Sequence, residues 1–283
     1  RPAVGALQEV WTDAARTPFA LDGYHRAFGD GPLGFFTEHG LLTLSRFPIV
    51  RAAALRFSCA ADADRCVHKG LLHTRLDLGE GRQLDVFNVH LQSGADNGAV
   101  RVAQVRELAR FVAGNSSGPF VLLGDFNCEA GDPEFELMRR LLDRPTIRCS
   151  AGLPTYDCRH NPLAAPEPPT EIDHILIAGG LTLRGAHRFG ADLLNPLSDH
   201  FGISAEVCVP NRVHAAARQV VCGLYPVPYP HRNRRCWRKR ASIASSAGTS
   251  RGCRPPHSSS RRVARSRRDW AIGASGSEAT RGN

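Results

Sequence analysis

The stretch PFVLLGDFNCE at residues 119–129 decides the fold and the chemistry that we expect of this chain. Its apolar run at 120–123 ends at Gly124, and a run of that length bounded by glycine is typical of a buried strand. Asp125 and Asn127 follow on alternate positions, so their side chains would share one face of an extended chain. A carboxylate beside a carboxamide suits a divalent cation next to a phosphate. The alternative interpretation is a strand followed by an Asx-rich turn.

Polar residues also stand at the ends of other predicted strands. Besides the pair in GDFN, they are Glu9, His90, Asp173, Asp199 and His200. One charged group at one strand end is unremarkable, but a set drawn from acids, Asn and His argues for a single polar cleft. Within it, Glu9 and Asp125 can hold a cation, which we expect to be Mg²⁺ because the ligands are oxygens. A His oriented by a carboxylate can take a proton from water, and a second His can donate one to the departing alkoxide.

Hydrophobic patterning around these residues predicts mainly strands, with at least two helices. We expect strands at 3–11, 40–45, 69–78, 84–90, 171–178, 181–189 and 203–209 besides the one before GDFN, and helices at 98–113 and 132–142. A Gly-Glu-Gly turn joins 69–78 and 84–90 into a hairpin, whereas 143–170 is rich in Pro and polar residues and is expected to be mostly loop. This pattern favours an α/β fold of two packed sheets with helices outside.

Charge is spread unevenly along the 283 residues. Residues 211–283 hold 16 Lys and Arg but two acidic residues, whereas residues 1–210 hold 20 basic and 25 acidic residues, a net charge of −5. The overall charge of +9 therefore describes the C-terminal segment and does not indicate a nucleic-acid enzyme. We expect a catalytic domain at 1–210 and a basic, disordered tail at 211–283. Two alternatives for the tail are an arm for nucleic acid or anionic lipid and the product of a misread frame.

Few other features of the sequence limit the class of protein to which the chain can belong. No apolar run approaches the ~20 residues needed to cross a bilayer, and no Cys or His spacing is typical of a zinc site. The chain begins at Arg1 and not at Met, so we interpret it as a fragment with a truncated N-terminus. Secreted and cytoplasmic locations both stay open at this point.

Five motifs, in order, carry a resemblance to a known superfamily. They are LQEVW at 7–11, HLQSG at 90–94, GDFN at 124–127, EIDHI at 171–175 and LSDHFG at 197–202. Over residues 3–209 the chain resembles the endonuclease/exonuclease/phosphatase superfamily, with its deoxyribonuclease-like fold. HKG at 68–70, HLQSGAD at 90–96, RVAQVRELARFV at 101–112 and GDPEFELMRRLL at 131–142 are similar to the neutral and bacterial secreted sphingomyelinases. The resemblance implies a four-layer αββα sandwich of mostly antiparallel sheets and a metal-dependent phosphodiesterase of phospholipase C type.

The resemblance also implies the ligands of the metal. Glu9 looks like the metal carboxylate, with Asp125 and Asp199 as further metal contacts. The ion would be Mg²⁺, with Mn²⁺ or Co²⁺ as substitutes. Asp125 and Asn127 resemble the pair that binds the phosphate and orients the attacking water.

Catalytic and phosphate-binding roles follow from the same resemblance. His90 resembles the histidine near the leaving group. His200 resembles the essential base or phosphate-binding histidine, with Asp173 as its carboxylate partner. Lys69 and Asn88 are similar to residues that contact the phosphate, although a solvated lysine at a strand edge is an alternative for Lys69.

The chain departs from the family in two places. The family begins with a strand whose Asn helps to bind the metal, and this chain starts after that strand. We therefore expect a sandwich without its first strand, in which the strand that ends at Glu9 becomes an exposed edge. The bacterial sphingomyelinases also carry an aromatic hairpin before the final Asp-His, where this chain has the short FGADLLNP at 189–196. That difference weakens the case for membrane docking.

The leading hypothesis is a phosphodiesterase that cleaves the headgroup of a phospholipid, with peripheral membrane contact and no obligate protein partner. The enzyme alternative is a nuclease or a small phosphate-ester phosphatase on the same fold. The other alternative is a truncated, inactive member of the family. Nucleic acid is the less favoured substrate, because residues 1–210 are net acidic and duplex binding needs a basic stripe.

Overall fold

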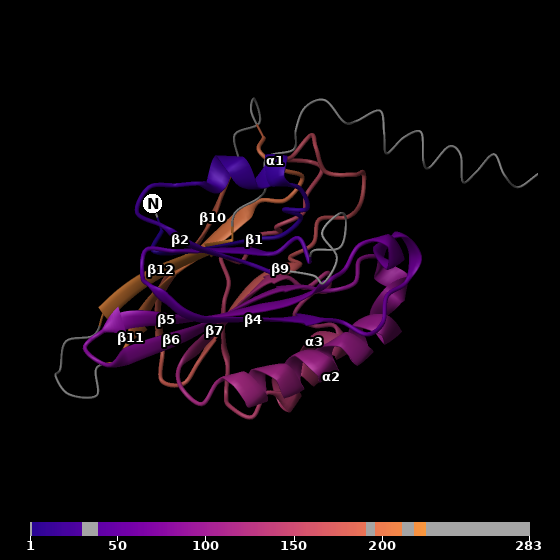
Figure 1. Ribbon diagram of the computed structural model, residues 1–283. Coiled ribbons are helices and arrows are strands. Elements are labelled where there is room, and N and C mark those ends of the chain that lie inside the picture. The colour runs from indigo at the N-terminus through magenta and orange to yellow at the C-terminus, as the bar shows by residue number, and fades with distance from the viewer. Residues whose placement is uncertain (1, 30–38, 191–195, 211–217, 225–283) are drawn as a thin grey trace, which may run out of the picture. The chain divides into compact units, whose positions relative to one another are not determined.

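The computed structural model describes residues 2–29, 39–190, 196–210 and 218–224, which form two packed six-stranded sheets (Figure 1). Sheet A has the strand order β10-β11-β12-β1-β3-β2, and sheet B has the order β4-β5-β6-β7-β9-β8. Each sheet contains one parallel pair, β1 with β12 in sheet A and β6 with β7 in sheet B. The other neighbours are antiparallel, which confirms the predicted sandwich.

The strand bounds agree with most of the predicted ranges. In sheet A the strands are β1 (Val4–Leu7), β2 (His25–Phe28), β3 (Leu42–Ser45), β10 (Thr182–Phe189), β11 (Gly202–Val209) and β12 (Arg218–Leu224). In sheet B they are β4 (Ile49–Arg56), β5 (Gly70–Gly79), β6 (Arg82–His90), β7 (Phe120–Asp125), β8 (Ile147–Cys149) and β9 (Asp173–Ala178). Sequence patterning missed β2, β4 and β8, which lie at sheet edges.

Helices on both outer sides of the sheets complete four layers (Figure 1). The two long helices, α2 (Gly98–Asn115) and α3 (Pro133–Leu141), pack on sheet B. Their bounds agree with the predicted helical ranges 98–113 and 132–142. The short α1 (Asp13–Arg16) and the 3₁₀ turn η1 (Thr17–Phe19) lie against sheet A. Two further 3₁₀ turns, η2 (Asp62–Cys66) and η3 (Ala95–Asn97), stand in loops. Within the described ranges, no helix is long and apolar enough to cross a membrane.

The strand β7 is buried on both faces, which explains its continuous apolar run. Val121 and Leu123 pack into the core between the two sheets, whereas Phe120 and Leu122 pack under α2 and α3. All four side chains are fully buried. Each such burial stabilises the fold by about 1.5–3 kcal/mol. The strand that carries GDFN is therefore anchored at the centre of sheet B.

The strand β1 is not an edge, and the expectation of an exposed edge is wrong. Residues Arg218–Leu224, taken from the predicted tail, form β12 between β1 and β11. Val220, Cys222 and Leu224 are buried in the core between the sheets. Their alternation is the period-two signal of a strand, but the basic composition of residues 211–283 as a whole concealed it. The boundary at 210 thus falls before a strand of sheet A, and residues 211–217 and 225–283 lie outside the described residues.

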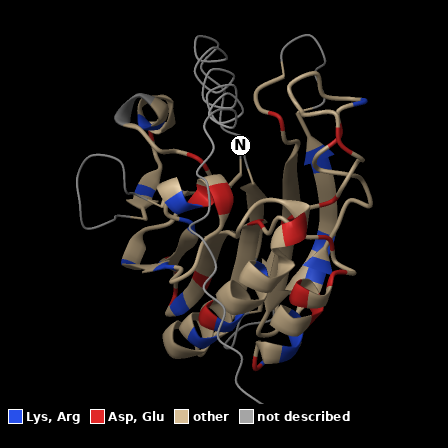
Figure 2. Cartoon of the chain, turned by 90° about the vertical axis from the view of Figure 1, so that its right-hand side faces the viewer, with Lys and Arg blue, Asp and Glu red and all other residues tan. Residues whose placement is uncertain are grey.

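Basic and acidic residues both occur along the strands and helices of the fold. In the view of Figure 2, Lys and Arg are interspersed with Asp and Glu.

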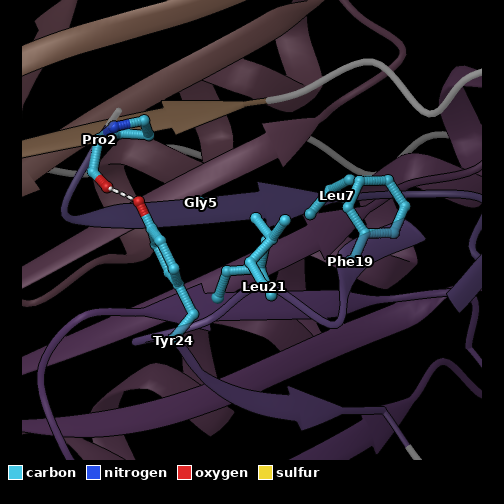
Figure 3. Close-up of a pocket in the computed structure, with 7 residues that line it drawn as sticks. Pro2, Gly5, Leu7, Phe19, Leu21 and Tyr24 are labelled. Atoms are coloured by element: carbon cyan, nitrogen blue, oxygen red, sulfur yellow. Dashed lines mark hydrogen bonds between the residues drawn. The ribbon is translucent and has the colours of Figure 1, made fainter. Parts of the chain in front are cut away.

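A small apolar pocket lies on the outer side of sheet A (Figure 3). It has a volume of about 170 Å³ and is lined by Pro2, Gly5, Leu7, Phe19, Leu21, Tyr24 and Leu44. Tyr24 closes one end, because its hydroxyl donates a hydrogen bond of 2.5 Å to the carbonyl of Pro2. Since its lining contains no carboxylate or histidine, this pocket does not supply the chemistry that the sequence predicts.

We predict that β12 is part of the cooperative fold. Leu224→Ala should lower the free energy of unfolding by about 2–5 kcal/mol, because it empties a site in the core between the sheets. The matched control is Val50→Ala on β4, where the side chain is 54% exposed and the change should stay within about 0.5 kcal/mol. Urea denaturation of the full chain measures both. If Leu224→Ala changed the free energy of unfolding as little as Val50→Ala does, β12 would not contribute to the core.

Candidate active site

Three neighbouring strands of sheet B place candidate residues side by side. In the parallel pairing of β6 with β7, His90 lies opposite Asp125. In the antiparallel pairing of β7 with β9, Asp125 lies opposite Asp173. The register of the sheet therefore brings a histidine and two carboxylates to one end of sheet B.

Gly124 makes this register possible. Its φ is 152°, and a Cβ at this position would lie 1.9 Å from the carbonyl oxygen of Val89 on β6. No side chain can occupy that space, so only glycine allows the two strands to approach each other this closely. The glycine of GDFN is thus a condition for placing Asp125 beside His90.

The carboxylate of Asp125 is buried and surrounded by donors. Its Oδ1 accepts a hydrogen bond of 2.8 Å from the backbone N–H of Asn127. Its Oδ2 accepts one of 3.2 Å from the Asn127 side chain and lies 3.3 Å from His90 Nε2. Burial raises the pKa of Asp125, but the hydrogen bond with His90 and nearby positive charges, His200 among them, outweigh it and hold the pKa well below its usual range. Asp125 is therefore anionic.

Asn127 reaches Asp125 through a turn, not through an extended strand. β7 ends at Asp125, and Asn127 has a φ of 51°, in the left-handed region that Asn tolerates better than most residues. Its side-chain amide also donates a hydrogen bond of 3.0 Å to the carbonyl of Leu91, just after β6. The structure thus brings Asp125 and Asn127 together, as predicted. The prediction that they share one face of an extended chain is wrong, because a turn brings them together.

His200 and Asp173 form a hydrogen-bonded dyad. His200 Nδ1 donates to Asp173 Oδ2 at 2.8 Å, and the ring of Tyr156 packs edge-on against the imidazole. Burial lowers the pKa of His200, but the charge and hydrogen bond of Asp173, with the charges of Asp125 and Asp199, raise it to about 10. The imidazole is accordingly a cation at neutral pH when these carboxylates are its main neighbours.

Lys69 lies inside the site, so the alternative of a solvated strand-edge lysine is wrong. Its Nζ is 2.8 Å from His90 Nε2 and 3.2 Å from Asp64 Oδ2, and all three residues are buried. Asp64 also accepts hydrogen bonds from the backbone and hydroxyl of Ser93. Sequence reasoning missed Asp64, which lies in η2 between β4 and β5 and outside the quoted motifs. The sequence did contain a signal for Asp64, because it is an acidic residue five positions before the lysine of the HKG motif.

Buried polar residues of α2 hold the segment that follows His90. Arg101 donates to the carbonyls of Gln92 and Gly94 at 3.2 and 2.7 Å and forms an ion pair of 2.7 Å with Glu134 on α3. Gln104 accepts a hydrogen bond of 2.8 Å from the backbone N–H of Gln92. These contacts connect three of the quoted motifs, HLQSGAD, RVAQVRELARFV and GDPEFELMRRLL. They fix the segment after β6 from the side of the helices.

Three predicted residues are placed differently from the rest. Glu9 follows β1 with an exposed side chain and a φ of 62°. Asp199 is half-buried and accepts a hydrogen bond of 3.1 Å from Ser198. Asn88 is buried between the sheets, where its amide donates to the carbonyls of Leu7 and Leu42 at 3.1 Å each. Its two N–H groups are thus engaged by sheet A, and its phosphate contact stays a prediction.

The carboxylates offer a set of atoms that suits a hard cation. One ligand atom from each of Asp125, Asp173 and His200 lies within 4.8 Å of the others. Glu9 is not part of this group within the described residues, although Gln8 beside it donates a hydrogen bond of 2.6 Å to Asn88 on β6. Asp125 and Asp173 are buried carboxylates, and Asp199 is a third carboxylate that is half-buried. Their oxygen atoms suit Mg²⁺ better than a metal that prefers sulfur ligands.

Comparison with known proteins identifies relatives of this chain. A sequence model of the Endonuclease/Exonuclease/phosphatase family matches residues 1–200. A sphingomyelinase of Mycobacterium bovis is 31% identical over 111 residues, which cover 38% of this chain and 22% of that protein. The chain thus matches about a fifth of the length of this curated relative.

Two solved structures share the fold at low sequence identity. A Staphylococcus aureus beta toxin variant with bound magnesium ions has a TM-score of 0.58 and 20% identity, covering 72% of this chain and 86% of that one. A TDP2 of D. rerio complexed with a single-strand DNA product has a TM-score of 0.59 and 18% identity, covering 71% of this chain and 84% of that one. At these identities the likeness concerns the fold.

We predict that Gly124 tolerates no side chain. Gly124→Ala should lower the free energy of unfolding by about 3 kcal/mol or more, because β6 and β7 must move apart. Gly114→Ala, in α2 with no atom within 4 Å of the added Cβ, is the control and should raise it by roughly 0.5–1 kcal/mol. Chemical denaturation of both variants measures the difference. A neutral Gly124→Ala would refute the close-approach argument.

A second prediction concerns the dyad in protein freed of metal by a chelator. His200 should titrate with a pKa near 10, as its carboxylate neighbours require. Asp173→Asn removes the negative partner of the imidazolium, so the pKa should fall toward the ordinary value of about 6.5. NMR titration follows the imidazole signal, which is assigned from its loss in His200→Gln. An unchanged pKa in Asp173→Asn would mean that the dyad does not control this group.

Proposed function

The chain belongs to the endonuclease/exonuclease/phosphatase family, and on that premise we propose that it hydrolyses a phosphodiester of a choline phospholipid, in the manner of a sphingomyelinase. The observation that carries the proposal is the His200–Asp173 dyad, held at 2.8 Å beside the anionic Asp125. A histidine fixed by one carboxylate and placed next to another is suited to proton transfer at a phosphate ester. The similarity to a sphingomyelinase supports the lipid as substrate.

We assign the cation to the carboxylates at this end of the sandwich. Asp125, Asp199 and Glu9 would hold it, and Mg²⁺ is the expected ion because the donors are oxygens. When bound, it would neutralise a phosphoryl oxygen and offset the carboxylate charge that now raises the pKa of His200. Magnesium ions in the beta toxin structure, a relative in fold, support this choice.

The histidines would divide the proton transfers between them. His200, oriented by Asp173, takes a proton from the attacking water once its own pKa is lowered. His90 lies across Asp125 from the dyad and contacts Lys69, so it is placed to assist the departing alkoxide. Lys69 is buried beside it and supplies positive charge for a phosphoryl oxygen or for the leaving group. Asn127, bonded to Asp125, would orient the attacking water and the phosphate.

A nuclease is the second candidate. It is favoured by the fold shared with a TDP2 bound to single-strand DNA. It is opposed by the net charge of −5 on residues 1–210, since nucleic-acid binding gains most of its affinity from basic groups. Peripheral contact with a membrane follows from the lipid proposal, and no protein partner is required by it.

The test is a side-by-side assay of the full chain with Mg²⁺. Sphingomyelin, a lysophospholipid, plasmid DNA and an inositol phosphate are the substrates, and release of phosphocholine is the expected result. His200→Gln should lower the rate by a factor of about 10² or more, the usual scale for losing an acid–base group. His25→Gln, on the exposed surface of β2, is the control and should stay within about twofold. A chelator should abolish the reaction, and added Mg²⁺ should restore it.

The outcomes separate the candidates. Glu9→Gln should mainly weaken the dependence on Mg²⁺, so excess metal should recover part of the rate. Cleavage of DNA without cleavage of either lipid would replace the sphingomyelinase assignment by a nuclease. No cleavage with Mg²⁺, Mn²⁺ or Co²⁺ would favour the inactive family member.

A further inference from the structure

The two members of the dyad come from different sheets. Asp173 is the first residue of β9 in sheet B, and His200 stands two residues before β11 in sheet A. No ladder of strand pairing connects β9 with β11, because each belongs to its own sheet. The 2.8 Å contact between them therefore needs a separate element that fixes one sheet end against the other.

Thr155 contacts both sides of this junction. Its Oγ1 accepts hydrogen bonds of 3.1 Å from the backbone N–H groups of Ile172 and Asp173, on the sheet B side. Its carbonyl oxygen accepts a hydrogen bond of 2.7 Å from the N–H of Phe201, on the sheet A side. The side chain is fully buried, so water cannot replace these contacts.

The segment around Thr155 is itself held firmly. The N–H groups of Thr155 and Tyr156 donate to the carbonyl of Thr170 at 2.9 and 3.0 Å. Tyr156 forms isolated antiparallel bridges with both Thr170 and His200. Asn161, also buried, donates a hydrogen bond of 2.8 Å to the carbonyl of Ser198. Through these hydrogen bonds and isolated bridges, the segment connects the two halves of the dyad.

We propose that Thr155 is the positioning residue that sets the Asp173–His200 geometry, acting through the hydroxyl oxygen that anchors the start of β9. The kinetic part of this inference depends on the proposed hydrolytic function. Thr155 lies in the range that was expected to be mostly loop, and no role was predicted for it.

The chemistry of the hydroxyl makes the inference specific. A hydroxyl oxygen has two lone pairs, and both are used here by backbone N–H groups. Valine has nearly the same shape but no acceptor, so Thr155→Val would leave two buried donors without partners. The backbone at Ile172 and Asp173 must then shift to find other acceptors. A displacement of about 1 Å in a catalytic group can cost about 10²-fold in rate.

The experiment compares three variants of the full chain with the wild type. Thr155→Val removes the acceptor, and Thr155→Ser keeps it. Thr74→Val is the matched control, because Thr74 is also a buried threonine and its hydroxyl has no hydrogen-bond partner in the described residues. Phosphodiester hydrolysis gives kcat and KM, and NMR of metal-free protein follows the Nδ1–H proton of His200, which is hydrogen-bonded to Asp173. Circular dichroism verifies that each variant is folded at the assay temperature.

We expect Thr155→Val to lower kcat by roughly 10- to 100-fold with KM changed by less than about threefold, and to lose the Nδ1–H signal. Thr155→Ser should restore both to near the wild-type level, and Thr74→Val should leave both unchanged. Wild-type behaviour of Thr155→Val in both readouts would overturn the proposal. An equal loss in Thr155→Ser would also overturn it, because the hydroxyl oxygen is present there.

Two provisions keep the test decisive. If Thr155→Val does not fold, Thr155→Cys replaces it, since sulfur is a weak acceptor and should give an intermediate loss; wild-type values for a folded Thr155→Cys would overturn the proposal.

If the wild type cleaves no phosphodiester, the proposed function fails, while the Nδ1–H signal still tests Thr155. Loss of that signal in Thr155→Val, with its return in Thr155→Ser, supports the positioning role without any activity.

Discussion

The close approach of β6 and β7 at Gly124 is the contact on which the rest of the site depends. A side chain at Gly124 would collide with the carbonyl of Val89, so the parallel register of these strands exists only with glycine there. That register puts His90 opposite Asp125, and the next strand puts Asp173 opposite Asp125 in turn. The apolar residues of β7, buried on both faces, hold the strand in place while its polar end reaches the site.

Buried charge imposes the second constraint. An isolated buried carboxylate is costly, so each one must meet partners. Asp125 has His90 and the amide of Asn127, and Asp64 has Lys69. Lys69 also contacts His90, so these pairs form one network of buried polar groups at the candidate site. The left-handed backbone at Asn127 fits this view, because hydrogen bonds to Asp125 and to the carbonyl of Leu91 hold this residue in place.

Two elements that lie outside the predicted strands complete the sandwich. The segment at Thr155 joins the start of β9 to the approach to β11, and so brings Asp173 to His200. The strand β12 fills the place beside β1 where an edge was expected, and it buries alternate side chains in the shared core. Both are short. The segment at Thr155 derives its structure from its neighbours, whereas β12 has an alternating apolar pattern that the basic composition of residues 211–283 conceals.

The sequence by itself determined the sandwich, because the period of its apolar residues and its ordered motifs predict two sheets with outer helices. It also indicated which polar residues follow or begin the strands, and five of these lie together at the candidate site: His90, Asp125, Asn127, Asp173 and His200. Only the tertiary structure decided that Asn88 bridges the sheets, that Lys69 is buried against Asp64, and that part of the basic segment is a core strand. The physical reason is that burial and pairing are set by contacts between segments far apart in the chain, whereas periodicity reports only which face of one segment is apolar.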